Sequence, residues 1–158
     1  MLSGTSLSAL RTLVYLGQHM PAVISPRRIA EDLGESPTYL SKVTTQLVKA
    51  GVLRAEKGVK GGVQLARPAS EITMLAVVEA CQGAIIGGYC RSVCRPSEVC
   101  GFHKAAQQLE AAIGETLRRW TLAELLKKPS RAQVLADGFS CVMLPPAAVA
   151  AAQERSVS

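Results

Sequence analysis

Two helix-forming segments begin with the same Ser-Pro signal and are separated by a single residue. They are SPRRIAEDLG, residues 25–34, and SPTYLSKVTTQLVKAG, residues 36–51. In each segment a serine can cap the free N–H groups, proline suits the first helical position and glycine suits the end. Only Glu35 lies between the two segments. A connection this short predicts a helix-turn-helix rather than a long antiparallel pair of helices.

The spacing of apolar residues changes from helical to alternating after Gly51. Residues 52–67, VLRAEKGVKGGVQLAR, alternate apolar and polar positions on both sides of a glycine-rich centre. This pattern predicts a hairpin of two short strands. A hairpin that directly follows a helix-turn-helix predicts a winged helix. In that fold the second helix enters the major groove of DNA, and the hairpin tip lies near phosphates or an adjacent minor groove.

The excess of basic side chains is concentrated in this region. The chain has a net charge of +6, and residues 25–67 hold eight basic and four acidic side chains. Such an excess favours a polyanionic partner, for which double-stranded DNA is the candidate here. DNA contact is favoured for a basic hairpin that accompanies a helix-turn-helix, although the same side chains are compatible with a merely solvated face. The basic candidates are Lys42, Arg54, Lys57 and Lys60.

Three further helices are predicted outside this region, over residues 6–17, 73–83 and 102–120. The last has an apolar stripe spaced by three or four residues and no obvious partner within so small a chain. It is therefore predicted to pack across a two-fold axis in a homodimer, as a symmetric DNA site requires. Trp120 is predicted to lie in the core or in this interface.

The predicted fold class is mainly α with a small β-hairpin wing, a winged helix-turn-helix domain joined to a long dimerisation helix. The DNA-binding domain is expected over residues 1–68, and a connecting helix with a cysteine-rich sensor loop over residues 69–101. The dimerisation helix and the segment after it are expected over residues 102–128. Residues 129–158 form a tail that is rich in alanine and is expected to be partly loose.

Three thiols and an imidazole lie close together in YCRSVCRPSEVCGFHK, residues 89–104. Cys90, Cys94, Cys100 and His103 fall within fourteen residues. A chain of 158 residues can bury a core without disulfides, and its five cysteines are an odd number. These features favour a reducing cytoplasm, where clustered thiols bind metal or sense redox state. The four side chains suit an iron-sulfur cluster, but a zinc site and thiol redox chemistry remain open.

Several function classes lack support in the sequence. No apolar run approaches the roughly 18 residues that span a bilayer, and no N-terminal signal pattern is present. A cytoplasmic protein with no membrane partner is therefore expected. The sequence also has no nucleotide-binding glycine fingerprint, no paired carboxylates and no nucleophile beside a base. We expect no enzymatic activity, and an iron-sulfur redox protein is the weaker alternative.

Several segments resemble, in order, the Rrf2 family of winged-helix regulators. They are SPTYLSKVTTQLVKAGVL, KGVKGGVQLAR and EITMLAVVEAC, followed by the Cys/His stretch and TLAELL, within residues 1–128. The family includes the iron-sulfur cluster regulator, the nitric oxide-sensing repressor and the cysteine metabolism repressor. The resemblance implies a homodimeric transcription regulator, for which we favour repression, bound to a double-stranded DNA operator.

The resemblance also implies which residues contact DNA. In the family, small hydroxyl residues before a Tyr-Leu pair of the recognition helix contact DNA, and Ser36 and Thr38 match them. Tyr39 and Leu40 match the Tyr-Leu pair itself, and Lys57 matches the basic residue ahead of the hairpin glycines. Ser41 stands where the iron-sulfur cluster regulator has a glutamate that tunes its choice of DNA motif, so that operator preference does not transfer. Lys60 stands where the hairpin of the family usually has glycine, and it adds a positive charge.

For the Cys/His stretch, the resemblance implies an iron-sulfur cluster with two irons and two sulfides, although a four-iron cluster is also compatible. Cys94, Cys100 and His103 fit the family spacing, whereas Cys90 lies only four residues before Cys94 and contracts the first interval. In the nitric oxide-sensing branch an aspartate near the N-terminus of the other subunit can be a ligand. The matching segment here, GTSLSALR at residues 4–11, has no acid, so the resemblance favours His103 as the fourth ligand. Iron-sulfur assembly machinery is a further implied partner. The alternative is a thiol-redox, zinc or small-ligand sensor loop without a cluster.

Overall fold

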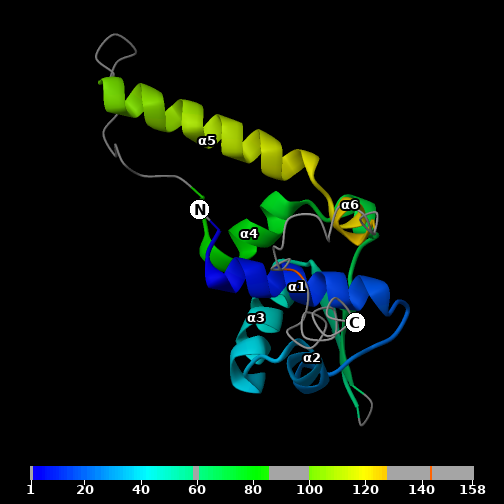
Figure 1. The fold of residues 1–158 in the computed structure, drawn as a ribbon. Coiled ribbons are helices and arrows are strands. Elements are labelled where there is room, and N and C mark those ends of the chain that lie inside the picture. The colour runs from blue at the N-terminus through cyan, green and yellow to red at the C-terminus, as the bar shows by residue number, and fades with distance from the viewer. Residues whose placement is uncertain (1, 59–60, 86–99, 128–142, 144–158) are drawn as a thin grey trace, which may run out of the picture.

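The structure, a computed structural model, describes residues 2–58, 61–85, 100–127 and 143. Helices dominate this part of the chain, and one antiparallel hairpin completes it (Figure 1). The predicted fold class is confirmed. The elements are α1 (Gly4–Gln18), α2 (Pro26–Leu33), α3 (Pro37–Lys49), β1 (Leu53–Glu56), β2 (Gly62–Leu65), the 3-10 helix η1 (Ala69–Glu71), α4 (Met74–Gln82), α5 (Gly101–Arg119) and α6 (Leu122–Leu126).

Helices α2 and α3 form the predicted helix-turn-helix. The Ser25 side chain caps α2 by accepting a hydrogen bond from the Arg28 N–H, and Gly34 ends the helix in the left-handed conformation with φ of 68°. Ser36 occupies the N-cap position of α3, but its side chain makes no capping hydrogen bond. The prediction that both serines act as side-chain caps is therefore wrong for Ser36, whose side chain is exposed to solvent.

Strands β1 and β2 form the predicted hairpin, with Leu53 opposite Leu65. The segment before α2 adds a short third strand, because the N–H and C=O groups of Ile24 both bond to the backbone of Val63, at 3.1 and 2.9 Å. The approach is so close that a Cβ on Gly62 would lie 2.5 Å from the Ile24 backbone. The hairpin is therefore fixed to the helix-turn-helix, an attachment that sequence patterns did not predict.

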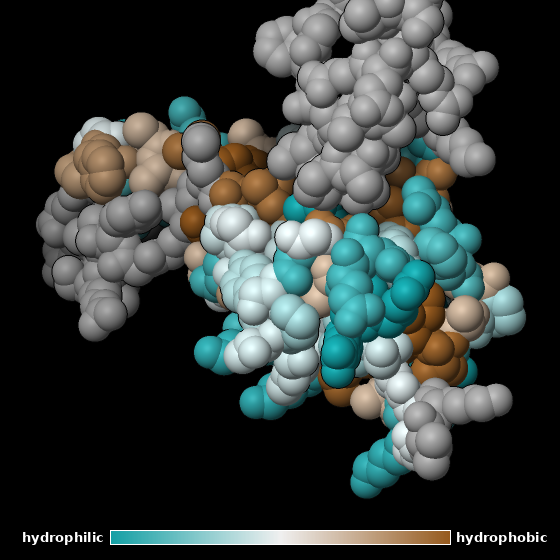
Figure 2. Space-filling model, turned by 60° about the horizontal axis from the view of Figure 1, so that its bottom comes forward, coloured by the Kyte–Doolittle hydropathy of each residue, from teal (hydrophilic) through white to brown (hydrophobic). Residues whose placement is uncertain are grey.

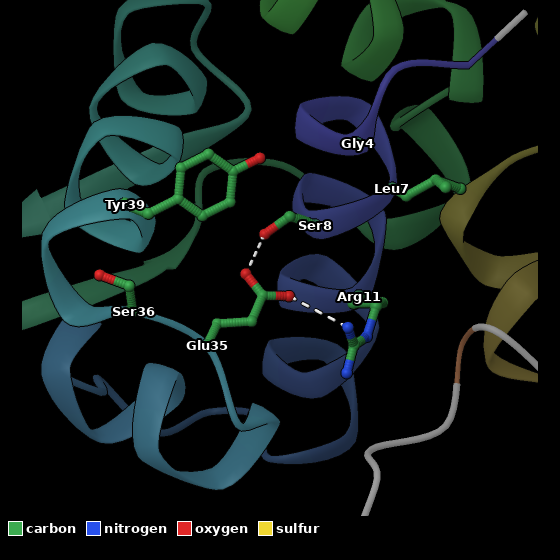
Figure 3. A pocket seen from close by; sticks show the side chains of 7 residues that line it. All are labelled: Gly4, Leu7, Ser8, Arg11, Glu35, Ser36 and Tyr39. Atoms are coloured by element: carbon green, nitrogen blue, oxygen red, sulfur yellow. Dashed lines mark hydrogen bonds and ion pairs between the residues drawn. The ribbon is translucent and has the colours of Figure 1, made fainter.

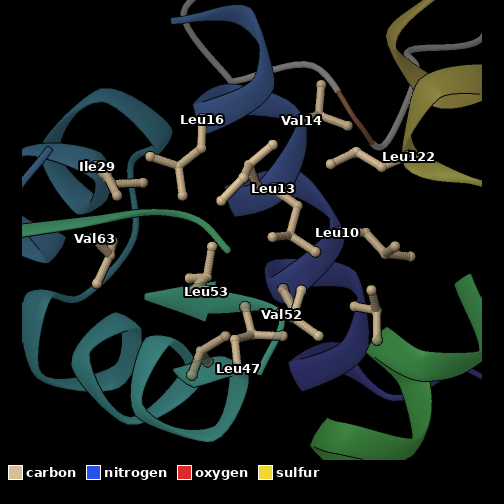
Figure 4. Close-up of a cluster of buried hydrophobic side chains, with 14 of the residues drawn as sticks. Leu10, Leu13, Val14, Leu16, Ile29, Leu47, Val52, Leu53, Val63 and Leu122 are labelled. Carbon is tan, nitrogen blue, oxygen red and sulfur yellow. The ribbon is translucent and has the colours of Figure 1, made fainter. Parts of the chain in front are cut away.

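The hydrophobic core surrounds α1, which crosses the middle of the molecule (Figures 1 and 4). Its buried side chains pack against the inner faces of α2 and α3 and against the hairpin. Helix α6 covers the end of α1, where Gly17 leaves room for the Leu126 side chain. The largest fully buried side chains are Leu13, Leu16, Ile29, Leu40, Leu47, Leu53, Ile72, Leu122, Val43, Val52, Val77 and Val78.

Helix α5 joins this body at its C-terminal end. The Met74 N–H donates to the Trp120 carbonyl and the Leu122 N–H donates to the Ile72 carbonyl, both at 2.8 Å, so the chain before α4 lies beside the chain after α5. Ile113 and Leu117 of α5 pack against α4. The N-terminal part of α5 extends away from the other helices (Figure 1). Trp120 is exposed rather than in the core, and its alternative place in a dimer interface stays a prediction.

Candidate nucleic-acid interface and sensor segment

Helix α3 separates its residues into a buried face and an exposed face. Leu40, Val43 and Leu47 pack into the core at helical spacing. The opposite face is mainly polar and exposed to solvent. The structure places all the candidate DNA contacts of this helix among its exposed residues, namely Ser36, Thr38, Tyr39, Ser41 and Lys42.

Tyr39 connects the exposed face of α3 to α1. Its hydroxyl group donates a hydrogen bond to the Thr5 Oγ1 atom at 3.3 Å, while the side chain remains exposed. Two threonines bond to the backbone of the same helix: the hydroxyl groups of Thr44, which is buried, and Thr45, which is exposed, donate to the Ser41 carbonyl at 3.1 and 2.7 Å. These bonds give the hydroxyl groups of both threonines a partner within the helix itself.

A groove of about 500 Å³ lies between α3 and the hairpin. Ser41, Thr45 and Lys49 contribute one wall, and Glu56 and Gly58 belong to the other. Lys57 is exposed next to this groove, whereas Lys60 lies outside the described residues. The face that carries α2 and α3 is mostly hydrophilic or intermediate in hydropathy (Figure 2). The structure therefore brings the exposed face of α3 and Lys57 of the hairpin to the same groove.

Arg54, the other candidate on the hairpin, is engaged by an acid. Its Nε atom lies 3.6 Å from the Glu56 Oε1 atom, and the Gln64 side-chain amide donates to the same oxygen at 3.0 Å. These three side chains share one face of the hairpin, because residues two apart on a strand point the same way and Gln64 stands opposite Arg54. The sequence shows Arg54 as a positive charge, but its pairing with Glu56 offsets that charge and has no local sequence signal.

A second pocket, of about 390 Å³, lies between α1 and the turn of the helix-turn-helix (Figure 3). Arg11 Nη1 lies 3.2 Å from Glu35 Oε1, and the Ser8 hydroxyl donates to the other carboxylate oxygen. Arg11 Nη2 also donates to the Leu33 carbonyl at 3.1 Å. The Arg11 and Glu35 side chains are only 17% and 13% exposed. This network fixes α1 to the residue that stands immediately before Ser36 and α3.

The sensor candidates are divided by the limits of the described residues. Cys100 occupies the N-cap position of α5, where its Sγ atom accepts a hydrogen bond from the His103 N–H at 3.4 Å. Cys100 is exposed and His103 is half-buried. Cys90 and Cys94 lie outside the described residues, so the predicted four-ligand set stays a prediction. Within the described ranges, no group of three His, Cys, Asp or Glu side chains is placed to hold a metal ion.

Cys81 is a small, half-buried residue at the edge of the hydrophobic core. It lies on α4 and packs against the main hydrophobic cluster. Burial raises the pKa of its thiol, which keeps the thiol in its neutral form. Cys81 is therefore chemically distinct from Cys100, which is exposed at a helix start.

Comparison with known proteins places the chain in one family. A profile of the Rrf2 family, described as an iron-dependent transcriptional regulator, matches residues 2–128. The chain is 31% identical over 123 residues to Protein aau3 of Rhizobium meliloti (strain 1021), a match covering 75% of this chain and 80% of that protein. It is 30% identical over 132 residues to the HTH-type transcriptional regulator NsrR of Halalkalibacterium halodurans, covering 80% of this chain and 90% of that protein.

Solved structures agree with this assignment. T. potens IscR superimposes with a TM-score of 0.66 at 26% identity, covering 87% of this chain and 93% of that one. CymR, described as the global cysteine regulator of B. subtilis, gives a TM-score of 0.67 over 80% of this chain and 95% of that one, and at 22% identity it supports the fold alone.

No helix in the described ranges is both long enough and apolar enough to cross a membrane. The family profile and the NsrR relative are both described as transcriptional regulators, which confirms the prediction of a regulator rather than an enzyme. The helix-turn-helix, the hairpin and the family profile lead to the same assignment. The chain belongs to the Rrf2 family of DNA-binding transcriptional regulators.

Proposed function

We propose that the protein is a cytoplasmic homodimeric regulator that binds a pseudo-palindromic operator through α3 and the hairpin, and represses transcription. We further propose that an iron-sulfur cluster held by Cys90, Cys94, Cys100 and His103 controls this binding. The observation that carries the proposal is the exposed polar face of α3 beside a hairpin that ends near Lys57. Two such helices in a dimer would address half-sites about 34 Å apart, one turn of DNA.

The start of α3 is suited to a phosphate group. The first N–H groups of a helix lack intrahelical partners, and no side chain caps those of α3. No acidic residue lies in the first turn of α3 to repel an anion. Thr38 and Ser41 lie on the exposed face that begins there and can reach base edges or the DNA backbone. Lys57 adds a phosphate contact from the hairpin, and Lys60 is proposed to do the same.

The exposed apolar side chains of α5 support a dimer. Phe102 is 63% exposed and Leu109 is 55% exposed, and they lie seven residues apart, on one side of the helix. The helix contacts α4 through Ile113 and Leu117, nearer its other end. A second copy of α5 is the occupant we propose for this stripe.

The position of Cys100 and His103 supports the sensor. Both stand at the start of α5, within one helical turn, so a group bound there would be attached directly to the proposed dimerisation helix. Thiolate and imidazole are the donors that iron-sulfur clusters use, so the described residues fit the group in their chemistry. The cluster, when bound, would supply a centre that changes with redox state, iron supply or nitric oxide. Loss of one ligand would release the start of α5 from this attachment.

The DNA-binding proposal is tested by the salt dependence of affinity. Lys57→Ala should weaken binding to all sequences and reduce the slope of log K against log salt by about one, because one phosphate contact is lost. Lys127→Ala, which removes an exposed positive charge just after α6, where it pairs with Glu124, is the control and should leave the slope unchanged. Thr38→Ala should alter the preference among sequences instead. An unchanged slope in Lys57→Ala would count against the hairpin contact.

The cluster proposal is tested by the visible absorption spectrum of protein purified without oxygen, with iron, sulfide and zinc measured on the same sample. We expect iron with matching sulfide, and a spectrum that is lost in Cys94→Ala but kept in the control Cys81→Ala. A colourless protein that cannot be reconstituted would contradict the cluster and shift the signal to zinc, thiol oxidation or a small ligand.

A further inference from the structure

We propose that Glu56 masks Arg54 and thereby limits the affinity of the hairpin for DNA, so that Arg54 contributes to binding only when Glu56 releases it. The inference rests on the proposed DNA-binding function and concerns the same surface. It assigns a role to an acidic residue inside a region whose excess charge is positive.

Glu56 lies beside the groove and next to Lys57 in the chain. It is the last residue of β1, it belongs to the wall of the groove facing α3, and it directly precedes Lys57. Adjacent Cα atoms are about 3.8 Å apart, so the Glu56 and Lys57 side chains start from neighbouring points of the hairpin. The Glu56 carboxylate repels any phosphate that lies within the Debye length, about 10 Å at 0.1 M salt.

Glu56 pairs with Arg54 and Gln64 on one exposed face of the hairpin. Glu56 Oε1 is shared between the Arg54 guanidinium group at 3.6 Å and the Gln64 amide at 3.0 Å. Arg54 and Glu56 side chains are 60% and 47% exposed, so the pair is reachable by DNA rather than locked in the core. As long as the pair persists, this face presents almost no net charge to a phosphate. Among the described residues of the hairpin, Lys57 is then the cation beside the groove whose charge no ion pair offsets.

Glu56→Gln removes the charge but retains a side-chain oxygen that can still accept the Gln64 hydrogen bond. The hairpin is therefore expected to keep its structure while Arg54 loses its ionic partner. Each additional phosphate contact changes log K by about 0.9 times the change in log salt. A contact that adds nothing at 1 M salt therefore gives about eightfold tighter binding at 0.1 M salt.

The experiment measures the affinity of the full-length protein for a duplex of mixed sequence over a series of salt concentrations. Glu56→Gln should bind up to about eightfold more tightly at 0.1 M salt, with a slope steeper by about one. Glu79→Gln, which removes an exposed acid from α4, is the charge-matched control and should change neither quantity. Arg54→Ala should have less than about a twofold effect alone, but should remove most of the gain when combined with Glu56→Gln.

The outcomes separate this inference from the proposed function. Unchanged or weaker binding by Glu56→Gln would overturn the masking role, as would an Arg54→Ala effect as large as that of Lys57→Ala. If Lys57→Ala still reduces affinity and slope in those cases, DNA binding through the hairpin stands and only the role of Glu56 fails. If the unmodified protein shows no salt-dependent binding to any duplex, both proposals fall.

Discussion

The ion pair between Arg11 and Glu35 predicts a measurable coupling between α1 and the turn that precedes α3. Exposed ion pairs contribute about 0–1 kcal/mol, whereas removing one partner of a buried pair costs about 3–5 kcal/mol. The side chains here are 17% and 13% exposed, which places the pair nearer the buried limit. We therefore expect Glu35→Ala to lower the free energy of unfolding by about 2–3 kcal/mol, because Arg11 and the Ser8 hydroxyl both lose their acceptor.

The assay is a double-mutant cycle followed by urea denaturation. Arg11→Met keeps an apolar stem of similar length and should cost about 2 kcal/mol, since the Leu33 carbonyl also loses a donor. The double variant should lose less than the sum of the two, with a coupling energy of about 1–2 kcal/mol.

A control cycle uses Arg27 and Glu31, which form an i,i+4 pair at 3.1 Å with side chains 83% and 49% exposed. Its coupling energy should be about 0.5 kcal/mol or less. Equal coupling in the two cycles, or a loss below about 1 kcal/mol in Glu35→Ala, would refute the idea that this pair fixes the turn.

Other predictions concern the hairpin, the stability of the fold at acidic pH and the proposed dimer. Gly62→Ala should lower the unfolding temperature and weaken DNA binding, because its Cβ would lie 2.5 Å from neighbouring backbone; Gly4→Ala, with no atom within 4 Å of its Cβ, should do neither. A hydrogen bond from the Tyr15 hydroxyl lowers the pKa of Asp32 in the folded protein. The stability that the ionised carboxylate adds is therefore complete above the pKa of the unfolded state, and it is lost as the pH falls through the pKa of the folded state. Asp32→Asn should reduce the pH dependence of the free energy of unfolding in that acidic range, as measured by urea denaturation, and should add no pH dependence in the neutral range. Leu109→Glu should convert the dimer to a monomer in sedimentation experiments, and a dimer that survives would contradict the proposed interface.

The parts of the fold that the sequence predicted are those whose signals are local. Pro26 and Pro37 each follow a serine at a helix start, and Gly34 ends α2 in a conformation that glycine adopts readily. The alternation on either side of the hairpin tip likewise reports which side chains face the core. Each of these signals is contained within a few neighbouring residues, so it can be interpreted before any tertiary contact is known.

The features that the sequence missed depend on contacts between distant segments. Ile24 pairs with Val63 across 39 positions, and the bridge between Thr73 and Thr121 joins the two ends of the α4 to α5 region. Neither pairing has a local pattern, because a strand of one or two residues has no periodicity to detect. The Arg11–Glu35 pair was missed for the same reason. In the site, the face of α3 follows from helical spacing, whereas the pairing of Arg54 with Glu56 required coordinates.

The described contacts also show how the two ends of the proposed mechanism are joined within one chain. Cys100 and His103 stand at the start of α5, and Leu117 near its other end packs against Leu75 and Val78 of α4. Helix α4 in turn contacts both α1 and α3. If Cys100 and His103 sense a signal as proposed, a shift of α5 on α4 is the route by which it would reach the DNA-binding face. Such coupling requires two arrangements of this packed interface with different affinities for DNA, and its sign depends on which arrangement the bound sensor group favours.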